Sequence, residues 1–319
     1  MSENIYIERA LEFLTFQYGF VPYALGASVL VGVVCGLVGT FLVLRGFSLI
    51  GDATGHATLP GVAGAFLVLV WLEGRGIGIS GELHNSVALL VGALVSGGLG
   101  ALTVGLFSRG PRVRRDAAIG IVLSVFFGVG IVLLTYIQGL ETGRQAGLES
   151  FLFGRAAGVT PGEFWVLATA GAALCIAVAV FFRPLAILTF DEGYARAVGI
   201  NTPAMEIGLL GALSVAVVLS IQSVGVILVA AMLIIPPSAG RFMSGRLTGV
   251  IAWSMGLGAV SGFLGALTSY VFEGVATGPA MVLAATAFFV LALFFGPHGG
   301  LLWLWIRRQR RAEAEGGKS

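Results

Sequence analysis

The sequence predicts an all-α protein, a polytopic bundle of about eight or nine transmembrane helices, and two observations support this fold class. Hydrophobic residues make up 57% of the 319 residues and charged residues 11%, with a mean hydropathy of +0.98, which is typical of a chain whose solvent is lipid. Apolar segments of about 18 to 25 residues also recur along nearly the whole length, each long enough to cross about 30 Å of hydrocarbon. These segments leave no stretch for a separate soluble domain.

Nine segments are predicted to cross the membrane: 20–44, 58–72, 86–107, 117–138, 162–182, 205–221, 222–240, 249–272 and 279–296. Segment 58–72 is short for a full crossing, and 205–240 also fits one long helix or a helix with a re-entrant piece. The transmembrane domain is expected to cover residues 20–306. Residues 1–19 mix polar and apolar character and are expected to form an interfacial segment. Residues 307–319 are expected to form a basic cytoplasmic tail.

Clusters of positive charge predict the orientation, because cytoplasmic loops carry an excess of Lys and Arg. Arginines crowd the loop at 109–115 and the tail after Arg307, so both are expected on the cytoplasmic side. The connections at 183–204 and 241–248 then lie on the same side, which receives 14 of the 18 Lys and Arg residues. The N-terminus comes out external.

Small residues predict close contacts between helices. Two GxxxG patterns, at residues 32–36 and 258–262, allow transmembrane backbones to approach each other, although they do not identify the partner helix. Cys35 and Cys175 each stand alone in an apolar run. They are expected to be small core side chains, since two cysteines provide neither a disulfide framework nor a metal cluster.

The most informative stretch is a polar interlude at residues 45–61, between two apolar runs. It holds Asp52 and His56, which share one face of a helix because they are four residues apart. An ionised carboxylate near the bilayer centre costs about 3 kcal/mol on insertion scales, so the pair indicates a cation site. Its oxygen and nitrogen ligands suit Mn²⁺, Fe²⁺ or Zn²⁺ better than Mg²⁺. Structural roles are the alternative: Asp52 as the cap of the helix entering Pro60, and His56 as a hydrogen-bonded helix residue.

A second informative stretch is the predicted cytoplasmic loop at 188–201. Asp191 is expected to cap a short helix and Gly199 to end it. Three small apolar residues would give this helix a surface that fits the groove of another protein; they are Ala195, Ala197 and Val198. An interfacial helix lying on the cytoplasmic leaflet fits the composition about equally well.

Four ordered motifs resemble those of metal-type ABC importer permeases, the ABC-3 family, which moves manganese, zinc or iron. The resemblance covers about residues 15–300. The motifs are 41–61, with Arg45, Gly51-Asp52, His56 and Pro60-Gly61; 148–154; 190–200, with Phe190-Asp191-Glu192 and Ala195-Arg196-Ala197-Val198-Gly199-Ile200; and 228–236. The chain departs from the family pattern at Gly55, where Ser is usual, at Gly46-Phe47 and at Pro237.

The resemblance implies a type II ABC importer permease that forms its pore as a homodimer in a bacterial-type plasma membrane. It implies an extracytoplasmic metal-binding protein and two cytoplasmic ATP-binding subunits as partners, with no nucleic acid. It also implies that Asp52 and His56 contact the transported metal, while water, backbone carbonyls freed near Pro60, or the same pair in the second copy complete the shell. The residues implied to couple to the ATPase are Phe190, Asp191, Glu192, Ala195, Arg196, Ala197 and Gly199.

The chain shows no nucleotide site of its own. Its only Gly-Lys-Ser, at 317–319, has Ala312 where a P-loop needs glycine. We therefore predict a transport subunit that is not an enzyme, holds no permanent cofactor and relies on its partners for ATP hydrolysis. Two alternatives remain: an ion-coupled secondary carrier in which Asp52 titrates, and an ABC permease for metal chelates.

Overall fold

The computed structural model describes residues 2–15, 19, 21–75, 82–108, 113–139, 159–272, 274–303 and 305. Within these ranges all regular secondary structure is helical, and nine helical segments are long and apolar enough to cross a membrane. They are α2 (Val21–Leu44), α3 and α4 together (Ser48–Ala57 and Leu59–Gly74), α5 (Glu82–Phe107), α6 (Arg115–Gln138), α8 (Pro161–Val180), α11 (Thr202–Val224), α12 (Val226–Met243), α13 (Leu247–Val271) and α14 (Thr277–Phe295). The predicted all-α bundle is confirmed.

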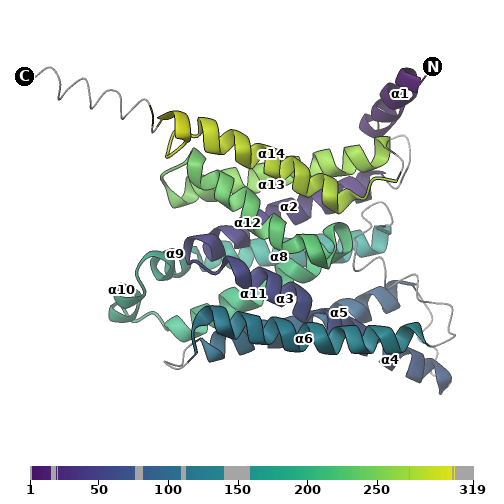
Figure 1. Ribbon diagram of the computed structural model, residues 1–319, viewed down its shortest axis with the longest axis horizontal. Helices are drawn as coiled ribbons and strands as arrows, with labels where there is room; N and C mark the ends of the chain where they lie inside the picture. The colour runs from purple at the N-terminus through teal and green to yellow at the C-terminus, as the bar shows by residue number, and fades with distance from the viewer. Residues whose placement is uncertain are drawn as a thin grey trace, which may run out of the picture.

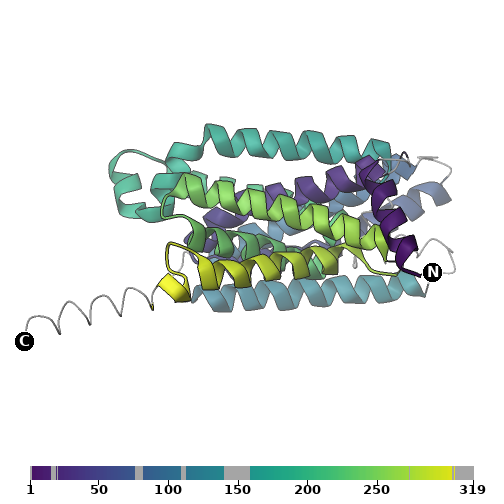
Figure 2. The same ribbon diagram turned by 90° about the horizontal axis from the view of Figure 1, so that it is seen from above.

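The long helices lie side by side and alternate in direction, so the connections gather at the two ends of the bundle (Figures 1 and 2). Helix α2 begins at one end and α14 finishes at the other. The described parts of three segments predicted to be cytoplasmic, 109–115, 183–204 and 241–248, share the end at which α10 lies (Figure 1). A short N-terminal helix, α1 (Ser2–Leu14), lies at the opposite end and packs on α13 through Phe13 and Tyr270, whose ring centroids are 5.4 Å apart.

Two span boundaries differ from the prediction. The crossing predicted at 58–72 begins at Ser48, because the chain stays helical through the polar residues of α3, and Thr58 joins α3 to α4 in the right-handed helical conformation (φ −73°, ψ −25°). Low hydropathy had placed this start about three turns too late. The stretch 205–240 forms two helices, as the span prediction had it, but they are separated at Gly225 and not at 221–222, because its φ of 86° ends α11 and starts α12.

The two GxxxG patterns pack against each other. A Cβ atom added at Gly32 would lie 2.0 Å from the carbonyl oxygen of Gly258, and one added at Gly258 would lie 2.1 Å from that of Gly32. Gly36 and Gly262 are similarly close to the backbone of the facing helix. Helices α2 and α13 therefore meet backbone to backbone, at a distance that only glycine permits.

Helix α2 occupies the centre of the bundle, and 72% of its most apolar window is buried. Its core contacts include Phe41, which is fully buried, and Cys35, whose Sγ lies 3.1 Å from the Ser220 Oγ on α11. Cys175 on α8 is partly buried and packs against the same core. Both cysteines are the small core side chains that the sequence predicted.

Candidate metal site and coupling helix

A tight turn after α2 directs the next helix back into the bundle. Gly46 takes a left-handed conformation (φ 71°), and the Phe47 N–H donates to the Leu42 carbonyl oxygen at 2.8 Å while the Gly46 N–H donates to that of Val43 at 3.2 Å. This pair of bonds closes the end of α2 as a Schellman motif, with Phe47 and Leu42 both buried beside it. Helix α3 starts at the next residue, Ser48.

Asp52 and His56 lie on one face of α3, as the four-residue spacing predicts. The His56 Nε2 is 3.5 Å from the Asp52 Oδ1, and the side chains of His56 and Asp52 are 20% and 39% exposed, respectively. Asp52 stands inside α3, whose N-cap is Phe47, while the N-cap of α4 is Thr58, and neither helix start has a side-chain cap. The helix-cap alternative for Asp52 is therefore wrong.

The surroundings of His56 leave its second nitrogen without a partner. The imidazole meets the ring of Phe127 on α6 edge to face, with centroids 5.0 Å apart. Its Nδ1 is buried and has no hydrogen-bond partner among the described residues. In the same part of the chain, no group of three or more His, Cys, Asp or Glu side chains could hold a metal. The pair thus presents one carboxylate and one imidazole, both partly exposed, next to the ring of Phe127.

The backbone near Pro60 differs from the expectation that its carbonyls would be open to a metal. The Ala57 carbonyl oxygen accepts a hydrogen bond from the Ser96 Oγ at 2.6 Å, and that of Gly55 accepts one from the Thr58 Oγ1 at 2.6 Å. The Thr58 amide also donates to the carbonyls of Gly55 and His56. Pro60 lies within the first turn of α4, where its missing N–H breaks little. The Gly55 and Ala57 carbonyls therefore have hydroxyl partners, and the His56 carbonyl has the Thr58 amide.

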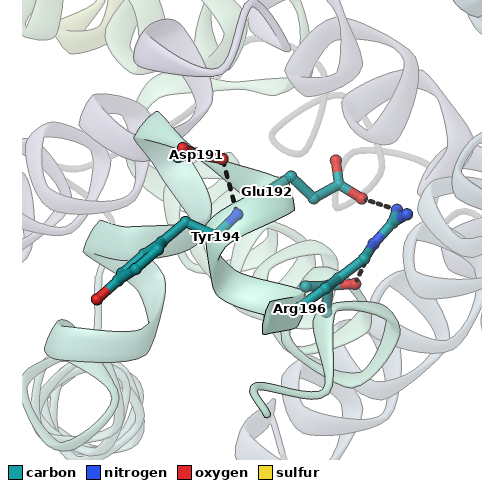
Figure 3. A network of polar contacts seen from close by, with 5 residues as sticks. Asp191, Glu192, Tyr194 and Arg196 are labelled. Carbon is teal, nitrogen blue, oxygen red and sulfur yellow. Dashed lines mark hydrogen bonds and ion pairs between the residues drawn. The ribbon is translucent and has the colours of Figure 1, made fainter. Parts of the chain in front are cut away.

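The predicted short helix within residues 188–201 is confirmed. Helix α9 (Phe182–Phe190) leads to α10 (Glu192–Ala197), and the Asp191 Oδ1 accepts a hydrogen bond from the Tyr194 N–H at 2.8 Å (Figure 3). Gly199 ends the turn with a φ of 82°, and the Ile200 N–H donates to the Ala195 carbonyl oxygen at 3.0 Å. Asp191 therefore caps the start of α10 and Gly199 ends the turn after it, as the sequence predicted.

The outer surface of α10 differs in part from the predicted one. Ala195 is fully buried, because it faces the inner side of the turn, and so it cannot offer the external surface assigned to it. Ala197 and Gly199 are exposed. The large exposed side chains are Phe190, Tyr194 and Val198. Sequence reasoning missed Tyr194, and helical spacing gave no signal for it, because Asp191 interrupts the helix between Phe190 and Tyr194.

Polar contacts tie α10 to the bundle. Arg196 pairs with Glu192 one turn earlier, and its Nε donates to the Thr202 Oγ1 at the start of α11, at 3.4 Å (Figure 3). The segment predicted to couple to the ATPase is thus a short helix held by side-chain contacts. Two other sequence predictions, the motif at 148–154 and the basic tail at 307–319, lie outside the described residues.

Comparisons with known proteins agree with this arrangement. Residues 17–296 match the model of the ABC 3 transport family. The chain is 42% identical over 298 residues to the manganese transport system membrane protein MntC of Bacillus subtilis (strain 168), covering 93% of this chain and 66% of that protein. It is 35% identical to the zinc transport system membrane protein TroC of Treponema pallidum (strain Nichols), covering 94% and 97% of the two chains.

A solved structure shows the same fold. The structure described as PsaBC from Streptococcus pneumoniae in complex with Fab superposes with a TM-score of 0.77 at 33% identity, covering 92% of this chain and 99% of the other. The nine apolar helices and the family match make this chain a multi-pass protein of the bacterial plasma (inner) membrane. A resemblance first carried by short motifs thus extends over nearly the whole fold, and the chain belongs to the ABC 3 transport family.

Proposed function

We propose that this chain is the permease of an ATP-driven importer for Mn²⁺, Zn²⁺ or Fe²⁺, and that the metal passes the Asp52–His56 pair. The observation that carries the proposal is the position of this pair: a carboxylate and an imidazole 3.5 Å apart, both partly exposed, inside a membrane-crossing helix segment. Such groups are expensive in a membrane and mark ion pathways. Relatives named as manganese and zinc transport proteins support the substrate class.

The proposed pore is formed by two copies of the chain. One copy supplies one oxygen and one nitrogen ligand, whereas two copies facing each other across a symmetry axis would supply four side-chain ligands. The 39% exposure of the Asp52 side chain leaves room for such a second pair or for water. A sparse shell of this kind suits transport, because the ion must leave as readily as it enters.

The proposed partners act at opposite ends of the bundle. An extracytoplasmic metal-binding protein would deliver the ion at the end where α1 lies. Two cytoplasmic ATP-binding subunits would each receive one α10, which carries the exposed Tyr194 and is flanked by the exposed Phe190 and Val198. Exposed apolar side chains of this kind can serve as anchors in the groove of a partner. ATP hydrolysis would belong to those subunits.

The deciding experiment is metal uptake by the complete importer, reconstituted in vesicles, with Asp52→Asn and His56→Ala. Both variants should assemble and lose uptake, because asparagine removes the anionic ligand and alanine removes the imidazole. Thr54→Ala is a matched control on the same helix, since the Thr54 hydroxyl only bonds the Ile50 carbonyl of its own helix. Uptake by Asp52→Asn at the level of this control would remove Asp52 from the pathway.

The same vesicles separate the importer from the alternative carrier. An importer requires ATP and the ATP-binding subunits, so the permease alone should carry no metal under a proton gradient. Gradient-driven uptake by the permease alone would favour the carrier. Lowering the pH toward about 5 should weaken metal binding by the importer, because a proton competes for the imidazole nitrogen that binds the metal.

A further inference from the structure

A cluster of charge and aromatic contacts lies at the cytoplasmic end, outside the candidate metal site. The Phe47 ring has two arginines on it: the Arg45 Cζ is 4.7 Å from its centroid, and the Arg115 Cζ is 4.1 Å from it. The Phe47 ring is only 3% exposed, whereas Arg45 is partly buried and Arg115 is exposed, so the two contacts are shielded from water on the side of the ring. We name Arg45, Phe47 and Arg115 the Phe47 joint.

The joint connects the two elements that frame the metal pair. Phe47 is the N-cap residue of α3, the helix that carries Asp52 and His56. Arg115 is the first residue of α6, the helix whose Phe127 contacts the His56 ring. Because α3 starts without a side-chain cap, the ring contacts of Phe47 hold the start of α3 against the start of α6.

Nearby charges also act on the joint. Burial lowers the pKa of Arg45, whereas the carboxylates of Glu206 on α11 and Glu192 on α10 raise it, and Arg115 lowers it. The joint therefore lies in the electrostatic field of acidic residues at the same end of the bundle.

One donor atom of the joint has no hydrogen-bond partner in the described part of the chain. The Arg45 Nη1 is buried and has no hydrogen-bond partner among the residues that the structure describes. A buried donor left unpaired is unfavourable, and a movement that brings an acceptor within reach removes this penalty.

We propose that the Phe47 joint positions α3 relative to α6 and transmits movement at this end of the bundle to the Asp52–His56 pair. This inference rests on the proposed function. It makes Arg45, Phe47 and Arg115 positioning residues: they do not touch the metal, and their loss should separate ATP hydrolysis from transport without altering the affinity of the metal site.

Arg115→Gln is the sharpest test, because the side chain is exposed and its removal leaves the core intact. Arg114→Gln is the matched control: Arg114 is the exposed neighbour, with the same charge, and has no described contact with Phe47. Phe47→Leu removes the ring while keeping an apolar side chain in the turn. Phe47→Tyr keeps a ring of comparable cation–π strength and should restore coupling.

Two quantities are measured on the complete reconstituted importer: Mn²⁺ affinity without nucleotide, and the number of ATP molecules hydrolysed per Mn²⁺ imported. We expect Arg115→Gln and Phe47→Leu to raise the ATP-to-metal ratio about two- to fivefold, the size of effect that a cation–π contact with an exposed arginine has on an equilibrium. Arg114→Gln and Phe47→Tyr should keep the wild-type ratio. The affinity should stay within about twofold in all four variants.

A wild-type ratio for Arg115→Gln would overturn the proposal, and so would a loss of Mn²⁺ affinity equal to the loss of uptake. The Asp52→Asn variant distinguishes this failure from failure of the proposed function. Normal Mn²⁺ import by Asp52→Asn refutes the metal site, whereas an inactive Asp52→Asn beside a normally coupled Arg115→Gln refutes only the joint.

Discussion

Replacing Gly258 with alanine should weaken the bundle, whereas the same replacement at Gly256, two residues earlier on α13, should not. The Cβ of an alanine at position 258 would lie 2.1 Å from the Gly32 carbonyl oxygen, but nothing lies within 4 Å of a Cβ at position 256. Ordinary contact begins at 3.4 Å, so α2 and α13 would have to separate by about 1.3 Å, the difference between these two distances.

This separation sets the magnitude of the effect. A gap of 0.5 to 1 Å already removes about a quarter to a half of the dispersion energy of a contact, and overpacking in tight cores costs about 1–3 kcal/mol. Alanine favours a helix interior over glycine by roughly 0.5–1 kcal/mol, which opposes only part of this loss. We expect Gly258→Ala to lower the free energy of unfolding by about 1–2 kcal/mol and Gly256→Ala to raise it slightly.

The assay is the free energy of unfolding of the purified permease, titrated with a denaturing detergent in mixed micelles and followed by loss of helical circular dichroism. Gly256→Ala is the internal control for the propensity of alanine. Equal stability of the two variants would refute the argument, because it would mean that α2 and α13 do not meet at Gly32 and Gly258.

Two further predictions concern the cytoplasmic end and the orientation. Ala197→Trp should add bulk to the exposed side of α10, and Gly199→Pro should break its end, because proline cannot adopt the φ of 82° found there. Both variants should leave the permease inserted and dimeric, but ATP hydrolysis should no longer drive uptake. Full uptake by both variants would refute the assignment of α10 as the ATPase contact. In a cysteine-free background, Arg246→Cys should resist an impermeant thiol reagent in intact cells while Val275→Cys reacts, and labelling at position 246 would reverse the orientation.

The features that could be predicted from the sequence are those that depend on a few neighbouring residues or on the hydropathy averaged over a long segment. Hydropathy over about 20 residues identified the crossings, because lipid imposes one length on all of them. The cap at Asp191 and the stop at Gly199 were also predictable, since each depends on a few neighbouring residues. The four-residue spacing placed Asp52 and His56 on one face.

Other features depend on neighbours that are distant in sequence, and these were not predictable. The start of α3 at Ser48 was missed because polar residues lower the hydropathy of a helix that the rest of the bundle buries. Nothing in the local sequence showed that the Ser96 hydroxyl would satisfy the Ala57 carbonyl, or that Ala195 would face inward. The contact between Phe47 and Arg115 likewise joins residues that only the packing of α3 on α6 brings together.

The central place of α2 has a consequence for how the protein is made. Helix α2 leaves the ribosome before the other described membrane-crossing helices, yet α13, against which its glycines pack, begins about 200 residues later. At bacterial synthesis rates this interval lasts about 10 to 40 s. During that time the glycine face of α2 can contact only lipid or earlier helices, and lipid tails provide no hydrophobic force that would drive it away. Membrane insertion of α2 and its final packing are therefore two events separated in time. The packing partner of this early helix, α13, is synthesised late.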